Sequence, residues 1–109
     1  MNMVDKGVSI RAGSVDMTHG GGGRAMAELI ADLFQRHLGN PILAQGNDGA
    51  LLEPQNGRLV MSTDGHVISP LFFPGGDIGS LSVHGTLNDV AMAGARPVSL
   101  TASFILEEG

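Results

Sequence analysis

The chain has 109 residues, of which 42% are hydrophobic and 16% charged, so the composition predicts one globular domain rather than two domains or a disordered chain. Its formal net charge of −5 and its single lysine, Lys6, argue against binding to nucleic acids or anionic membranes, which requires a basic surface. The absence of cysteine from the sequence excludes disulfides, thiolate zinc sites and thiol catalysis.

The N-terminal residues show no pattern typical of a signal peptide. No apolar run reaches the length of a membrane span, and residues 1–17 lack the apolar core of a signal peptide. We therefore expect a cytoplasmic protein. Residues 1–18 also lack hydrophobic periodicity, so we expect a flexible N-terminal arm there and the domain itself over residues 19–109.

The first predicted helix follows a run of four glycines, Gly20–Gly23. Apolar residues then recur at i, i+3 and i+4 spacing, which predicts an amphipathic helix over residues 24–38. The sequence Gly39-Asn40-Pro41 is a strong stop signal. The free amides of a glycine run ahead of a helix suit an anion, but no Gly-Lys-Ser/Thr sequence follows. Taken alone, the run is better explained as a flexible linker.

The remaining elements complete an α+β pattern. Strands are predicted over residues 42–53, 58–68 and 98–106, and Asn56-Gly57 favours a hairpin between the first two. Residues 69–76 read as a proline- and glycine-rich loop. A helix over residues 77–94 is apolar around most of its circumference, which is typical of a buried helix. Because nothing follows to cover the last strand, we expect a longer protein or dependence on a partner chain.

Three aspartates carry the strongest chemical signal. Asp48, Asp64 and Asp89 lie in different segments, each within or beside an apolar run, where an isolated carboxylate is costly unless it is paired or binds a metal. Oxygen ligands suit Mg²⁺, which in a chain with one lysine would help to bind phosphate. The alternative is that each aspartate caps a turn or a helix, which is favoured for Asp77 but not for Asp89 inside the helix.

Six segments, taken in order, resemble a known family. They are His19-Gly-Gly-Gly-Gly-Arg-Ala-Met-Ala-Glu-Leu-Ile, Asn47-Asp-Gly-Ala, Ser62-Thr-Asp, Pro70-Leu-Phe-Phe-Pro-Gly-Gly-Asp-Ile-Gly, Gly85-Thr-Leu-Asn-Asp-Val-Ala-Met-Ala-Gly-Ala-Arg-Pro and Phe104-Ile-Leu-Glu-Glu-Gly. Together they resemble the HypE family of hydrogenase maturation proteins, within the superfamily of aminoimidazole ribonucleotide (AIR) synthetase and selenophosphate synthetase. The resemblance runs from about residue 16 to the end of the chain.

The resemblance implies a fold and an activity. The fold would be the N-terminal domain of the AIR-synthase-like type, a mixed sheet with helices on one face, whose strands form a barrel shared between the subunits of a homodimer. The activity would be that of an ATP-dependent carbamoyl dehydratase, which converts a thiocarboxamide on a C-terminal cysteine to thiocyanate. The product supplies the cyanide ligand of nickel–iron hydrogenase. The implied partners are the carbamoyltransferase HypF and the HypC–HypD scaffold complex.

The resemblance also implies site residues, while leaving the catalytic residues unassigned. Three carboxylates would hold Mg²⁺ and the phosphates of ATP: Asp48, Asp64 and Asp89. The nucleotide would further contact two polar side chains and the glycine run: Thr63 and Asn88, with Gly20, Gly21, Gly22 and Gly23. The alternatives are a non-catalytic assembly or dimerisation module and the N-terminal part of another ATP-dependent synthetase of the superfamily.

Three positions depart from the family pattern. Ser80 stands where lysine is common, His84 where many members have cysteine, and His66 where an aromatic residue is usual. These departures bear on nucleotide affinity. The chain also contains neither the C-terminal domain nor the cysteine that would carry the carbamoyl group, so we expect that it cannot complete the reaction alone.

Overall fold

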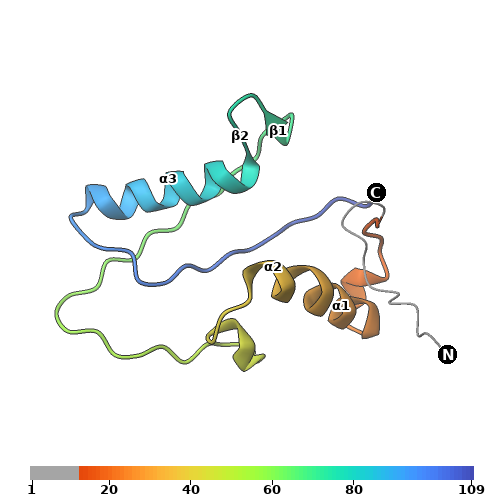
Figure 1. Cartoon of the computed structure of the whole chain (residues 1–109), viewed down its shortest axis with the longest axis horizontal. Coiled ribbons are helices and arrows are strands. Elements are labelled where there is room, and N and C mark those ends of the chain that lie inside the picture. Colours follow the sequence, from red (N-terminus) through yellow and green to blue (C-terminus); the bar gives the residue numbers. More distant parts are fainter. Residues whose placement is uncertain (1–12) are drawn as a thin grey trace. The chain divides into compact units, whose positions relative to one another are not determined.

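The structure is a computed structural model, and it describes residues 13–109. Contacts divide the chain into two units, Met1–Glu53 with Ser103–Gly109 as unit 1 and Pro54–Ala102 as unit 2 (Figure 1). None of the helices formed by residues 13–109 is long and apolar enough to cross a membrane. The predicted N-terminal arm lies outside the described residues except for its last part, residues 13–18.

The main helix of unit 1 covers the residues that the apolar periodicity predicts. It runs as one rod in Figure 1, although its hydrogen bonding changes to the wider π type in the middle. Its three parts are α1 (Arg24–Leu29), η2 (Ile30–Gln35) and α2 (Arg36–Leu38).

The C-terminal segment packs on this helix. The ring centroids of Phe34 and Phe104 lie 5.0 Å apart in a tilted arrangement, which suits two aromatic rings. Val15 and Gly109 exchange two backbone hydrogen bonds, of 3.3 and 2.8 Å. Leu29, which is 2% exposed, is the one large apolar side chain that is buried within residues 13–109. Unit 1 therefore has a small core around a single helix.

The helix ends at Gly39, as the sequence predicts, for a steric reason. A Cβ atom at this position would lie 2.4 Å from the carbonyl oxygen of Gln35. The φ of Gly39 is −54°, outside the left-handed region, so the backbone angle does not itself require glycine. Close approach to the last helical turn is what requires it.

The predicted strand over residues 42–53 is wrong, because the described chain forms no strand in this range. The 3₁₀ turn η3 (Leu43–Gln45) lies there instead. The side-chain oxygen of Asn40 accepts hydrogen bonds from the amides of Ile42 and Leu43, both at 2.9 Å. Asparagine followed by proline can end one helix and also begin the next. Here Asn40-Pro41 also begins a new turn.

The predicted strands over residues 58–68 and 98–106 do not form either, and both ranges follow an irregular path in Figure 1. Gly57 has a φ of 89°, as the predicted turn needs, but its flanking residues do not pair. A strand satisfies its backbone groups through a neighbouring strand, and residues 13–109 offer these ranges none. The described sheet is therefore limited to one small hairpin.

This hairpin lies where the sequence predicted only a loop. Strands β1 (Phe72–Phe73) and β2 (Gly76–Asp77) are antiparallel, with Phe72 opposite Asp77. The connecting Pro74-Gly75 has the residue order of a type II turn, and Gly75 has the positive φ, 92°, that such a turn needs. The hairpin leads directly into the long helix of unit 2.

Helix α3 (Ile78–Met92) confirms the second predicted helix and the role of Asp77 as its cap. The amide of Ser80 donates to Asp77 Oδ1 at 2.8 Å, and the amide of Asp77 donates to Ser80 Oγ at 3.0 Å. This reciprocal pair is a capping box, which satisfies two backbone donors at the start of the helix.

The other end of α3 is closed by glycine, at the last residue of the predicted range. Gly94 has a φ of 76°, and its amide donates to the carbonyl of Ala91 at 2.9 Å. The amide of Ala95 reaches the carbonyl of Val90 at 3.2 Å. These two bonds make a Schellman motif, which explains why the helix stops here.

The expectation that α3 is buried is not met within this chain. None of its residues is buried, and the apolar side chains of Leu81, Val83 and Met92 are exposed, Met92 by 88%. The helix is apolar on most sides, as the sequence indicated, but the described chain supplies no surface to cover it. The apolar surface of α3 is therefore open to solvent in this structure.

The capping box gives a direct test. Ser80→Ala should destabilise α3 by about 1 kcal/mol, because the backbone amide of Asp77 loses its acceptor, Ser80 Oγ. Thermal unfolding followed by circular dichroism at 222 nm measures the effect. Ser82→Ala is the matched control, since the Ser82 hydroxyl only donates back to the carbonyl of Gly79, at 2.8 Å, and alanine favours the helix interior. Equal melting of the two variants would contradict the assignment.

Candidate functional site

Asp64 is exposed and lies in the irregular segment that precedes the hairpin of unit 2. Its Oδ1 accepts a hydrogen bond of 2.8 Å from the amide of Gly65. Its Oδ2 lies 3.6 Å from Nε2 of His66, which is too long for a hydrogen bond but close enough for an ion pair when the ring is protonated. One carboxylate oxygen is thus held by the backbone, and the other faces the imidazole.

His66 brings this segment against α3. A Cβ atom built on Gly85 would lie 3.1 Å from His66 Nε2, so the imidazole occupies the space beside that glycine. Asn88 and Asp89 follow three and four residues later, which places them one helical turn away on the same side of α3. Four of the predicted site residues therefore lie on two neighbouring segments of unit 2: Thr63 and Asp64 on one, and Asn88 and Asp89 on α3. The glycine at position 85 permits the close approach.

Asp48 belongs to unit 1, in a loop closed by a side chain. The side-chain Nε2 of Gln45 donates to the carbonyl of Leu51 at 2.9 Å, and the side-chain Oε1 of Gln45 accepts from the backbone amide of Leu51 at 2.8 Å. Gly46 turns the chain with a φ of 68°. Asp48 is exposed within the loop that this pairing closes.

The predicted magnesium ligands are not assembled into one cluster within the described chain. No group of three or more histidine, aspartate or glutamate side chains that could hold a metal ion is formed by residues 13–109. Asp48 lies in unit 1, whereas Asp64 and Asp89 lie in unit 2. The metal assignment therefore stays a prediction that rests on the resemblance and on the oxygen chemistry of the donors.

The burial argument for these aspartates is wrong for this structure. Asp48, Asp64, Asp89 and Thr63 are all exposed. The apolar runs beside the aspartates suggested an interior, but those runs are themselves largely exposed, so the carboxylates keep their contact with water. No desolvation cost obliges them to bind a metal, and they are open to a ligand from solvent.

The glycine run is also open. Gly20 and Gly21 complete a 3₁₀ turn, η1 (His19–Gly21), and Gly22 follows with a φ of 71°. A Cβ atom built at any of the four glycines would meet no other atom within 4 Å. Only Gly22 needs glycine for its backbone angle, so crowding inside the chain does not explain the rest of the run.

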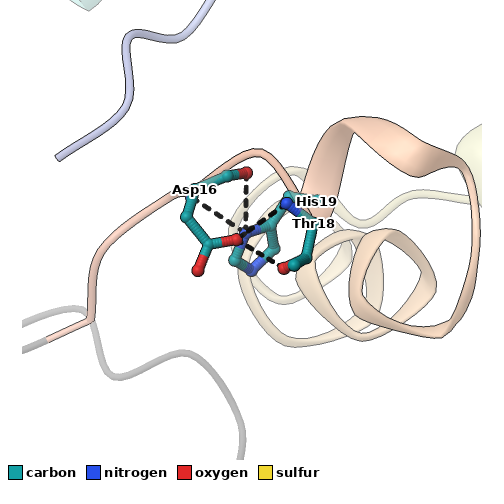
Figure 2. A network of polar contacts seen from close by, with 3 residues as sticks. All are labelled: Asp16, Thr18 and His19. Atoms are coloured by element: carbon teal, nitrogen blue, oxygen red, sulfur yellow. Dashed lines mark hydrogen bonds and ion pairs between the residues drawn. The ribbon is translucent and has the colours of Figure 1, made fainter.

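Sequence reasoning missed a polar cluster immediately before the glycines, formed by Asp16, Thr18 and His19, which we call the entry cluster (Figure 2). Asp16 Oδ1 accepts a hydrogen bond of 2.9 Å from the amide of Thr18 and a second from its hydroxyl. His19 Nδ1 lies 3.2 Å from the same oxygen. The Asp-X-Thr spacing is typical of a side-chain-capped turn and is the signal from which the cluster could be found.

These contacts stabilise the ionised form of Asp16. The hydroxyl and then the amide of Thr18 lower the pKa of the Asp16 carboxyl from its ordinary value, and the nearby His19 adds to this effect. Slight desolvation acts in the opposite direction. Hydrogen bonds to a carboxylate favour its charged form, so this is the expected sign.

Comparison with known proteins identifies the family. Residues 46–109 match the family described as AIR synthase related protein, N-terminal domain. The chain belongs to this family. Over all 109 residues it is 60% identical to the carbamoyl dehydratase HypE of Bradyrhizobium diazoefficiens, of which it covers 32%. It is also 68% identical over 102 residues, 94% of the chain, to the carbamoyl dehydratase HypE of Azotobacter vinelandii, of which it covers 30%.

A solved structure agrees with these relatives. The crystal structure of the hydrogenase maturation protein HypE in complex with ATP matches 73% of this chain, with a TM-score of 0.70 and 60% sequence identity. The match covers 24% of that chain, and this chain spans about a third of the length of the curated relatives. The predicted resemblance to HypE is thus confirmed.

Two of the three positions at which the resemblance implies a departure from the family make contacts here. Ser80 forms half of the capping box of α3. His66 fills the space beside Gly85. His84 is exposed on α3.

Unit 2 also has a depression of about 690 Å³ at the C-terminal end of α3. Residues from 55–60 and from 93–98 line it, including Arg58 and Arg96. None of the predicted site residues belongs to this lining. The depression is therefore separate from the residues assigned to nucleotide and metal.

The lowered pKa of Asp16 predicts how the entry cluster responds to acid. Because the folded-state pKa lies below the unfolded value of about 3.9, the carboxylate stabilises the turn above that pH and ceases to do so as the pH falls through the folded pKa. Thr18→Val removes the largest cause and should raise the pKa of Asp16. Carbon-detected NMR titration of the Asp16 carboxyl measures both values, and an unchanged pKa would contradict the hydroxyl contact.

Proposed function

We propose that this chain is the ATP- and magnesium-binding, dimer-forming N-terminal part of a HypE-like carbamoyl dehydratase. The observation that supports this most directly is its likeness to the HypE structure that contains ATP, at 60% identity over 73% of the chain. The family match to an AIR synthase related N-terminal domain is consistent with it. Because the chain spans about a third of its relatives, the complete reaction belongs to a longer protein.

The proposed reaction needs ATP to activate a poor leaving group. The carboxamide oxygen of a cysteine-bound thiocarboxamide attacks the γ-phosphorus of ATP, and ADP leaves. Loss of inorganic phosphate and of the amide protons then forms the carbon–nitrogen triple bond of the thiocyanate. Bound magnesium supplies neutralisation of charge on the phosphates. No residue of this chain is assigned as the base.

The residues of this chain serve to bind the phosphates. Asp64 and Asp89 lie on neighbouring segments of unit 2 and are exposed, so their oxygens are available to a hydrated magnesium ion. Asn88 and Thr63 offer polar contacts beside them. Asp48, which belongs to unit 1, is assigned from the resemblance alone. With one lysine in the sequence, metal and backbone amides carry most of the charge compensation.

Dimer formation would complete the fold. The ranges 58–68 and 98–106 contain exposed apolar side chains and unpaired backbone, which a second subunit could cover and pair. A barrel shared between subunits is the arrangement that the resemblance implies. The same resemblance gives the proposed partners, HypF and the HypC–HypD complex, and a cytoplasmic location.

The site assignment predicts a loss of nucleotide binding. In a protein in which this chain replaces the matching third of the Bradyrhizobium relative, Asp64→Asn and Asp89→Asn should each weaken magnesium-dependent ATP binding. The loss should be on the order of 10- to 100-fold, as expected when a charged contact is removed. Isothermal titration calorimetry with ATP and MgCl₂ measures it.

Asp77→Asn is the matched control for this experiment. It makes the same change of charge one turn before Ser80, yet asparagine is as good a helix cap as aspartate, so α3 should be preserved. ATP affinity should stay at the unsubstituted value. Unchanged affinity in Asp64→Asn and Asp89→Asn, or an equal loss in the Asp77 control, would refute the assignment.

A non-catalytic assembly module is the second candidate, and the exposed apolar surface of the chain favours it. Both candidates predict self-association, so sedimentation of the chain should give twice its mass of 11.2 kDa. A module that only assembles should release no metal-dependent heat when ATP is titrated into it. A third possibility, another synthetase of the superfamily, has less support because the relatives reported above are carbamoyl dehydratases by name.

A further inference from the structure

The turn that precedes the glycine run is organised around the carboxylate of Asp16. Figure 2 shows the side chains of Asp16, Thr18 and His19 converging at this point. Asp16 Oδ1 receives both the amide and the hydroxyl of Thr18, and the carbonyl of Asp16 accepts the amide of His19 at 3.1 Å. Every donor here comes from the next three residues. The entry cluster is therefore a closed local network.

The imidazole of His19 is held in a defined orientation. His19 Nδ1 lies 3.1 Å from the amide nitrogen of Asp16, 3.3 Å from its carbonyl oxygen and 3.2 Å from its Oδ1. The side chain is only 14% exposed, although most of the surrounding chain is open to solvent. A sheltered ring with three contacts to Asp16 restricts the backbone at residue 19.

The restricted backbone at residue 19 continues directly into the glycine run. The turn that the cluster begins continues as η1, in which the amide of Gly21 donates to the carbonyl of Thr18 at 3.3 Å. Gly22 and Gly23 follow, and α1 begins at Arg24. On the other side, Val15 is tied to Gly109 by two backbone bonds. The glycine run is thus fixed at its start and at its end, while its middle is unobstructed.

We propose that Asp16, Thr18 and His19 are positioning residues that set the conformation of the Gly20–Gly23 loop and thereby its affinity for the phosphates of ATP. This inference rests on the proposed function and on the contact between the nucleotide and the glycine run that the resemblance implies. A glycine run without such an anchor would lose more conformational entropy on closing. The entry cluster reduces that cost by ordering one end of the loop before the ligand arrives.

The first experiment measures the loop itself in the 109-residue chain. His19→Ala removes the acceptor at Nδ1 and should speed amide hydrogen exchange at Asp16 and Gly21 about fivefold, the effect of losing one hydrogen bond. His19→Asn places an oxygen where Nδ1 was and should restore slow exchange. His37→Ala, at an exposed histidine on α2, is the control and should change neither amide. Unchanged exchange in His19→Ala would overturn the proposal.

The second experiment measures ATP use in the chimera with the Bradyrhizobium relative. His19→Ala should raise the KM for ATP about fivefold with kcat unchanged, because the lost interaction lowers binding rather than the chemical step. His19→Asn should return the KM to the original value. A change in thermal stability without a change in KM would show a purely structural role and overturn the proposal. If the unsubstituted chimera uses no ATP, the proposed function and the link to phosphate both fail, and the exchange data alone decide whether the cluster holds the loop.

Discussion

Hydrogen bonds from polar side chains to nearby backbone set the path of this chain, because burial contributes little within it. Leu29 is the one large apolar side chain buried among residues 13–109. Side-chain hydrogen bonds do more of this work than burial. The Asp16 side chain organises the turn before the glycines, Asn40 begins the turn that leads into η3, and Asp77 begins α3. Each of these contacts joins residues two or three apart. The local structure can therefore form while large apolar surfaces stay open for other partners.

The helices could be predicted from the sequence because their signals are local. Apolar spacing gave residues 24–38, and the glycine and aspartate caps gave α3 to within two residues at each end. The strands could not be confirmed, because residues 58–68 and 98–106 have sequences that suit a sheet but find no pairing partner in the described chain. Strand formation depends on what lies alongside, which a single sequence does not contain.

The residues of the candidate site stay a prediction from the resemblance, and its geometry could not be derived from the sequence. Motif resemblance selected Asp64, Asn88 and Asp89, and the structure places them on neighbouring segments through the contact of His66 with Gly85. The physical argument for Asp48 and its companions assumed burial, which failed because apolar neighbours in sequence are not an interior. The entry cluster is predictable in part. Its Asp-X-Thr spacing indicates a turn in the sequence, but the low exposure of the His19 side chain appears only in the structure.

The loop that contains Asp48 can be closed in this way only by a side-chain amide at position 45. Gln45 donates to the carbonyl of Leu51 and accepts from its amide, so the side chain imitates the edge of a neighbouring strand. A carboxylate could accept the amide of Leu51 but would place a second acceptor against its carbonyl. Deamidation of Gln45 would therefore open the loop and add a negative charge near Asp48. Replacement of one nitrogen by oxygen at position 45 would thus change the electrostatic surroundings of a carboxylate three residues away.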